Sequence, residues 1–146
     1  MIIKSPVFQN NEFIPARFTC DGDNTRPELE FEEIPVDAKS LSLIVEDPDS
    51  PVPSFTHWVI WNINPETKLI KEGNVPGGAV EGLNDAKKIG YIGPCPNKGT
   101  HRYIFNLYAL KDYLNLPSGA SKSELRSAIN DKIIATTQLI GVYKRK

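Results

Sequence analysis

The sequence has little of what marks a specialised class of protein. Its 146 residues contain two cysteines, Cys20 and Cys95, too few for a disulfide framework, although a single bridge between them stays open. The net charge of −1 gives no overall reason to expect nucleic acid or an anionic membrane as a partner. No apolar run approaches the roughly 20 residues of a membrane helix, and Met1–Phe13 lacks the apolar core of a signal peptide. We therefore expect one cytoplasmic domain, residues 1–146.

Local motifs of enzymes and metal sites are also missing. There is no CxxC or HExxH spacing for zinc, and no GxSxG nucleophile elbow. Asp47, Cys95 and His101 could form a nucleophilic arrangement, but Cys95 lies between two prolines and not at a helix N-terminus that would activate its thiol. We expect no catalytic residue, no metal and no cofactor.

Most of what is present predicts β-strands. Ser40–Asp47 alternates, with Asp47 on the face that carries its leucines. His57–Ile63 and Tyr103–Leu110 are apolar on both faces, which is typical of strands inside a sheet that is covered on both sides. Strict alternation in His57–Ile63 places three apolar side chains on one face: Val59, Trp61 and Ile63. Weaker strand candidates are Val7–Phe13, Leu29–Ile34 and Leu139–Lys144.

One helix is predicted, from Lys122 to Ala135. Ser121 can cap its N-terminus, and Glu124, three residues later, completes a capping box. Its apolar stripe consists of Leu125, Ala128, Ile129 and Ile133. A shorter helix around Asp112–Leu114 is a weaker expectation.

The strand ends bring an acid and two histidines together. Asp47 ends one predicted strand and His57 begins the next, so an antiparallel pair would place both at one end of the sheet. His101 begins a third strand, directly after the long glycine-rich segment Glu72–Thr100, which we expect to be an ordered, functional loop. A partly desolvated Asp47 needs a partner, either Arg102 or a histidine.

A purely structural reading of these residues stays open. Asp47 and Asp49 can be turn formers in a proline-rich turn, because aspartate bonds its own backbone and proline fixes φ. His57 beside Trp58 can be a core histidine, and the glycines of the long loop can be simple turns.

Four motifs resemble the phosphatidylethanolamine-binding protein family, in the short form found in bacteria and archaea. They are DPDSP at Asp47–Pro51, HW at His57–Trp58, GYIGPCP at Gly90–Pro96 and GTHRY at Gly99–Tyr103. Their order and spacing are specific, and weaker matches extend over nearly the whole chain. The resemblance implies a mainly β fold, in which a large central antiparallel sheet is flanked by a smaller sheet and by one or two short helices.

The resemblance also implies a small pocket at one end of the sheet that binds phosphate or a phosphorylated head group. Its walls, carried over by position, would be Asp47, Asp49, Ser50, Pro51, His57, Gly93, Pro94, Cys95, His101 and Tyr103. The histidines and the Tyr103 hydroxyl can donate to an anion, and backbone N–H groups around Gly93 and Gly99 can form an anion nest. Asp47 would orient a histidine.

The expected function is therefore binding and not catalysis, with a kinase or protease as a possible protein partner. The alternatives are a protein inhibitor of serine proteases or kinases that acts through its surface, and an enzyme that uses the His/Asp pocket for acid–base chemistry. From the resemblance we also expect a homodimer, and a pocket more open than in longer members. We further expect a cis peptide bond at Ser50–Pro51.

Overall fold

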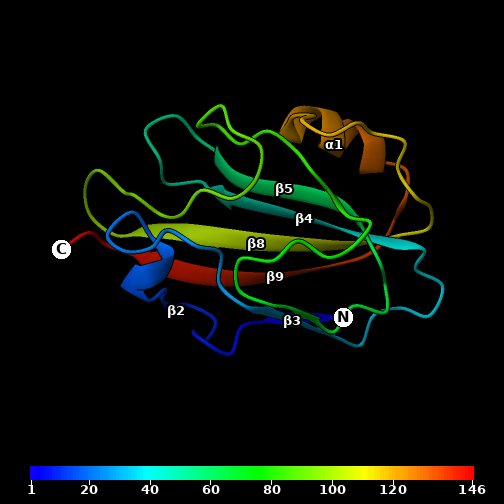
Figure 1. Cartoon of the computed structure of the whole chain (residues 1–146), viewed down its shortest axis with the longest axis horizontal. Coiled ribbons are helices and arrows are strands. Elements are labelled where there is room, and N and C mark those ends of the chain that lie inside the picture. Colours follow the sequence, from blue (N-terminus) through cyan, green and yellow to red (C-terminus); the bar gives the residue numbers. More distant parts are fainter.

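A computed structural model describes all 146 residues, which form two β-sheets and one α-helix (Figure 1). The larger sheet has six strands, in the order β2 (Glu12–Phe13), β9 (Ile133–Tyr143), β8 (His101–Leu110), β4 (Ser40–Asp47), β5 (Phe55–Ile63) and β7 (Val80–Glu81). The smaller sheet consists of β1 (Ile2–Lys4), β3 (Leu29–Glu32) and β6 (Leu69–Ile70). The helices are the 3-10 turn Ala16–Phe18 and α1 (Lys122–Ile129). No helix has the length and apolar character needed to cross a membrane.

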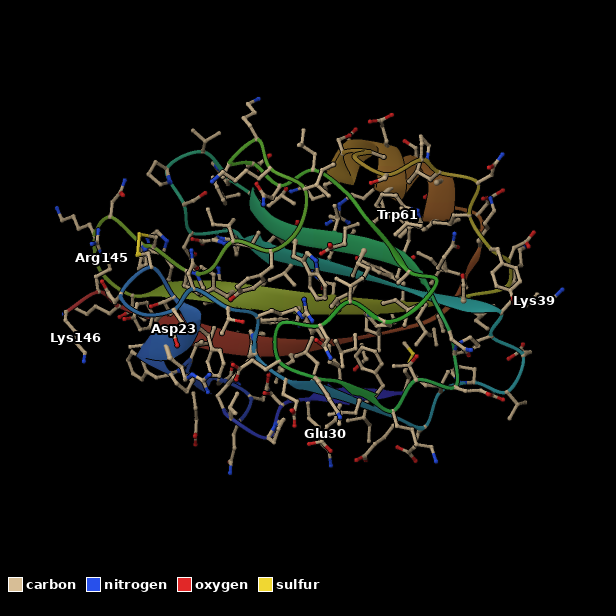
Figure 2. All side chains as sticks on the ribbon, in the orientation of Figure 1. Asp23, Glu30, Lys39, Trp61, Arg145 and Lys146 are labelled. Atoms are coloured by element: carbon tan, nitrogen blue, oxygen red, sulfur yellow. A yellow bond between two sulfur atoms is a disulfide. The ribbon has the colours of Figure 1, made fainter.

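Both faces of the six-stranded sheet are covered, as the apolar strands predicted. On one face, side chains of β4, β5 and β8 pack with Ile3, Leu29 and Phe31 of the three-stranded sheet. On the other face, the sheet packs with Leu125 and Ile129 of α1, and Figure 2 shows Trp61 close to that helix. The expected architecture, a large sheet between a smaller sheet and a short helix, is confirmed. Neighbouring strands of the large sheet are antiparallel except β2 and β9, which are parallel.

Two irregularities in β5 change which way its side chains face. Leu41 pairs with Ile63 and Leu43 with Ile60, so β5 has one extra residue there, and Asn62 has a positive φ of 54°. A β-bulge of this kind breaks the alternation of side chains. Ile63 therefore joins the core between the two sheets, and the prediction that it shares a face with Trp61 is wrong.

The second bulge falls at His57. Val45 pairs with Trp58 and Glu46 with Thr56, which leaves His57 as the unpaired residue. Without the bulge, His57 would face the same side as Val59, toward α1. With it, the imidazole lies against Tyr103 on the side of the three-stranded sheet.

Several predicted boundaries need correction. The helix ends at Ile129 and not at Ala135, because Ile133 and the residues after it pair with β8 along eleven residues of β9. No helix forms around Asp112–Leu114, where the Leu114 N–H donates to the Asn62 side chain instead. Within Val7–Phe13, the strand is confined to β2.

The N-terminal cap of α1 is testable. The Ser121 hydroxyl accepts from the Glu124 N–H at 3.1 Å, and the Glu124 carboxylate accepts from the Ser121 N–H, which confirms the capping box. We expect Ser121→Ala to lower the free energy of unfolding by about 1 kcal/mol, because a backbone donor loses its acceptor. Ser127→Ala, an exposed change in the same helix, should leave it unchanged or slightly higher. Equal losses for both variants in urea denaturation would contradict this role of the cap.

Candidate functional site

A cavity of about 200 Å³ opens at the end of the six-stranded sheet where β4 ends and β5 and β8 begin. In Figure 1 this end of the sheet lies on the left, near the C-terminus. The lining residues are Asp47, Ser50, Pro51, Phe55, His57, Ile92, Gly93, Cys95, Pro96, Asn97, His101 and Tyr103. Pockets for drug-sized ligands span roughly 300–1,000 Å³, so this cavity suits a smaller ligand.

Asp47 and His101 form the central pair of the cavity. The His101 Nδ1–H donates to Asp47 Oδ2 at 2.7 Å, and both side chains are almost fully buried. This confirms that Asp47 has a histidine partner and not Arg102. A carboxylate on Nδ1 fixes the tautomer and leaves Nε2 for a ligand. Nε2 accepts a hydrogen bond when the ring is neutral and donates one when it is protonated.

His57 presents the second Nε2 to the cavity. Its Nδ1–H donates to the Ile92 carbonyl oxygen at 2.7 Å, and its ring meets the Tyr103 ring edge-on at a centroid distance of 5.2 Å. Burial lowers the pKa of His57, although the hydrogen bond to Ile92 and the charge of Asp47 oppose the shift. Each neutral histidine thus already uses its single N–H donor on the protein, so only a protonated ring can donate to an anion.

Tyr103 stands behind the two histidines with its hydroxyl buried. The residue is 1% exposed, and its Oη has no hydrogen-bond partner of ordinary geometry, although Asp47 lies close by. Burial first, and then the negative charge of Asp47, raise the pKa of Tyr103 well above its usual range. A buried hydroxyl without a protein partner is uncommon in folded proteins, and the donor of Tyr103 thus stays available close to Asp47.

Asp49 and Pro94 do not line the cavity, unlike the other predicted wall residues. Asp49 accepts from the backbone N–H and from Nε of Arg102, each at 2.9 Å, and its other oxygen accepts from Nη2 at 2.9 Å. These bonds lower the pKa of Asp49 to about 2. Asp49 therefore ties the Asp47–Pro51 turn to β8 and positions Asp47.

The Gly93 backbone cannot contribute to an anion nest. Its N–H already donates to Asn24 Oδ1 at 2.8 Å, so that part of the prediction is wrong. A Cβ at this position would collide with the Asn24 side chain and the Phe18 carbonyl oxygen. Glycine is therefore required here for close packing of two backbone segments.

The Cys20–Cys95 disulfide closes one rim of the cavity. It is the yellow bond on the left of Figure 2, and the adjacent Cys20 N–H donates to the Pro94 carbonyl oxygen at 3.1 Å. Cys95 carries no free thiol in this structure. A nucleophilic Cys95 and a zinc site that uses it are both inconsistent with this bond.

The expected cis bond at Ser50–Pro51 is wrong. The one cis peptide bond in the chain joins Pro53 to Ser54. The turn is held instead by side chains that bond its own backbone: Asp47 Oδ1 accepts from the Asp49 N–H at 2.8 Å, and the Ser50 hydroxyl donates to the Val52 carbonyl at 2.7 Å. These bonds shape the turn with Ser50–Pro51 in the trans form.

Four lining residues were missed by sequence reasoning: Phe55, Ile92, Pro96 and Asn97. Ile92 and Pro96 lie inside the motif Gly90–Pro96 and Asn97 directly follows it, so counting every motif residue and its neighbours as wall residues would have found them. Phe55, two residues before His57, carries no such signal.

Comparison with known proteins agrees with this architecture. The family model described as phosphatidylethanolamine-binding protein matches residues 4–144. A UPF0098 protein of Methanothermobacter thermautotrophicus is 45% identical, with 99% of each chain covered. The crystal structure of a Chlamydia trachomatis protein described as a putative phosphatidylethanolamine-binding protein homologue has a TM-score of 0.94 at 40% identity, covering 99% of this chain and 97% of that one. Escherichia coli YbcL, described as a new member of the mammalian family, has a TM-score of 0.92 at 29% identity, covering 99% and 98%. The chain belongs to the phosphatidylethanolamine-binding protein family.

Burial of His57 predicts a loss of stability in acid. Because its folded pKa lies below the unfolded value of roughly 6.5, the unfolded chain takes up the proton first as the pH falls. The contribution of His57 is thus fully present above about pH 6.5 and is lost as the pH falls through the folded pKa. We expect the free energy of unfolding to decline less steeply in His57→Gln, which keeps a donor for Ile92. This prediction would be contradicted if the free energy of unfolding had the same pH dependence with and without His57→Gln. An NMR titration that places the pKa of His57 above 6.5 would contradict it as well.

Proposed function

We propose that the cavity binds a phosphate group in its protonated, monoanionic form, either inorganic phosphate or a phosphorylated head group such as phosphoethanolamine. The observation that carries the proposal is the pair of unpartnered Nε2 atoms, one of them on a histidine bonded to Asp47. One ring can accept from the P–OH group, and the other, once protonated, can donate to a phosphate oxygen.

Charge supports a monoanion. Asp47 already places one negative charge in a buried wall, and protonated His101 would neutralise it. His57, whose pKa burial lowers, favours the neutral form that accepts a hydrogen bond. A phosphate group without a proton would bring one more negative charge close to Asp47 than the monoanion does, and it would have no P–OH group to donate to His57. The resulting charge repulsion is costly where water is excluded.

Binding is favoured over covalent catalysis by the state of the possible nucleophiles. The Ser50 hydroxyl donates to the carbonyl oxygen of Val52, and Cys95 is in a disulfide. Acid–base chemistry by the histidines is the remaining enzymatic alternative. A screen with phosphomonoesters and phosphodiesters separates the readings: turnover lost in His101→Ala would favour the enzyme.

Modulation of a kinase or protease is a second candidate, supported by one surface feature. The turn beside the cavity exposes Val52, at 79%, between two prolines. A rigid turn with an exposed apolar tip suits insertion into a partner's groove. Val52→Asp should abolish inhibition of a responsive protease or kinase and leave phosphate binding intact.

Domain organisation and location stay inferences. We infer one domain over residues 1–146, because the three-stranded sheet and α1 cover opposite faces of the same large sheet.

The Cys20–Cys95 bond is evidence against the cytoplasmic location expected from the sequence, since disulfides are rare in the cytosol outside hyperthermophiles. Partner proteins and a homodimer remain predictions.

The phosphate proposal predicts that affinity falls with rising pH. Between about pH 5 and about pH 8 a phosphate group loses a proton, which removes the donor that a neutral histidine ring needs and adds negative charge beside Asp47. Isothermal titration with phosphate should show this decline. Sulfate is the matched probe, because it has the same shape and no proton at these pH values, so it should bind more weakly than phosphate at about pH 6. Equal affinities, or phosphate affinity independent of pH, would overturn the proposal.

Substitutions of the central pair give the third test of the site. His101→Ala should weaken phosphate binding by about 1.5–3 kcal/mol, the range for a hydrogen bond to a charged group. Asp47→Asn should cause a smaller loss, because it keeps the shape but no longer stabilises the protonated ring. Lys98→Gln is the control: Lys98 is exposed and follows the lining residue Asn97 without lining the cavity itself, so an equal loss there would indicate non-specific attraction.

A further inference from the structure

A second polar depression, of about 290 Å³, shares no residue with the first cavity. It lies between the segment before β3 and the loops around β7, and it includes two residues of opposite charge, Arg26 and Glu81. None of the four recognised motifs, as interpreted above, gives these two residues a role.

Arg26 is a buried cation with too few partners. The residue is 4% exposed, and its guanidinium stacks over the Trp58 ring at 4.6 Å from the centroid. A guanidinium carries five N–H donors. One, on Nη2, donates to the Lys71 carbonyl oxygen at 3.2 Å, and Nε is buried with no partner. A buried charge usually has an anionic partner, so the guanidinium is short of one.

Glu81 does not supply that partner. Its Oε2 accepts from the Trp58 indole N–H at 2.6 Å, so the carboxylate lies at the edge of the ring whose face carries Arg26. It acts on Arg26 through space without an ion pair. A Cβ at Gly90 would come within 3.4 Å of Oε2, so a glycine there leaves room beside the carboxylate.

The rim of the depression adds an apolar element. Val75 and Ile89 both line it, with exposures of 43% and 57%. A simple anion would be repelled by Glu81, and a simple cation by Arg26. A ligand with both charges and an apolar group satisfies every part of the lining.

We propose that this depression binds a free α-amino acid with an apolar side chain, its carboxylate on Arg26, its ammonium on Glu81 and its side chain against Val75 and Ile89. The buried, under-partnered guanidinium is the observation that points to a ligand, and the unpaired opposite charges define its class. The proposal is independent of the oxyanion site.

The two tryptophans provide a built-in readout. Each indole N–H gives its own NMR cross-peak, and the Trp58 N–H donates to Glu81, a lining residue of the proposed site. The Trp61 N–H donates to the Leu116 carbonyl on the side of α1 and serves as the internal control. Trp61→Phe assigns the two peaks. L-leucine should move the Trp58 peak saturably and leave Trp61 unmoved.

Analogues of leucine test each charge. Isocaproate lacks the ammonium, isoamylamine lacks the carboxylate, and glycine lacks the side chain. The affinity of each analogue should be at least about tenfold lower than that of leucine, since each lacks one charged group or the apolar side chain. If isocaproate binds as tightly as leucine, the site recognises only the carboxylate, and the proposal of a zwitterionic ligand is overturned.

Variants separate this site from the oxyanion cavity. Arg26→Met keeps an aliphatic side chain but removes the guanidinium over Trp58, and Glu81→Gln keeps an acceptor for the indole. Both should weaken leucine binding about tenfold or more, and His101→Ala should leave it unchanged. If Arg26→Met fails to fold, Glu81→Gln alone decides. No saturable shift of Trp58 with leucine, or a shift that survives Glu81→Gln unchanged, would overturn the proposal.

Discussion

The buried carboxylate of Asp47 is the constraint on which the candidate site depends. One of its oxygens accepts from His101 on β8, and the other accepts from the backbone of the turn that follows β4. The turn is held a second time by Arg102, which binds Asp49. A carboxylate buried in this way must be compensated, and the same bonds that compensate it set the tautomer of His101 and the shape of the rim. The requirements of folding and of ligand binding are thus met by one group.

The bulge at His57 is the second constraint, because it turns the imidazole toward Asp47 and Tyr103 instead of toward α1. It has a further effect. The neighbouring Trp58 faces the same side of the sheet, in the core between the two sheets, although consecutive residues of a regular strand face opposite sides. One inserted residue therefore allows His57 to line the cavity at the end of the six-stranded sheet while Trp58 lies under Arg26.

Apolar periodicity predicted the architecture because β4 and β5 are buried on both faces, while β8 is buried on one face and mostly half-buried on the other. This pattern survives local irregularity. It could not predict the face of Ile63, since a bulge shifts alternation without any composition signal. Ile133 satisfied both a helical stripe and a strand, and the long pairing of β9 with β8 decided in favour of the strand. The convergence of Asp47, His57 and His101 followed from strand ends. The strand ends could not predict which nitrogen of His57 is free, because this depends on the Ile92 carbonyl oxygen, 35 positions away in the sequence.

The nitrogen that each histidine leaves free changes the chemistry expected of the cavity. From the sequence alone, two histidines count as two donors for an anion. In the structure, each ring in its neutral form has its one donor bonded, to a carboxylate or to a carbonyl, so its Nε2 offers the cavity a lone pair. Only a ligand that brings a proton, or a pH that protonates a ring, turns it into an anion site. Under the proposed function, the cavity selects the protonation state of the oxyanion as much as its shape, through hydrogen bonds that never touch the ligand.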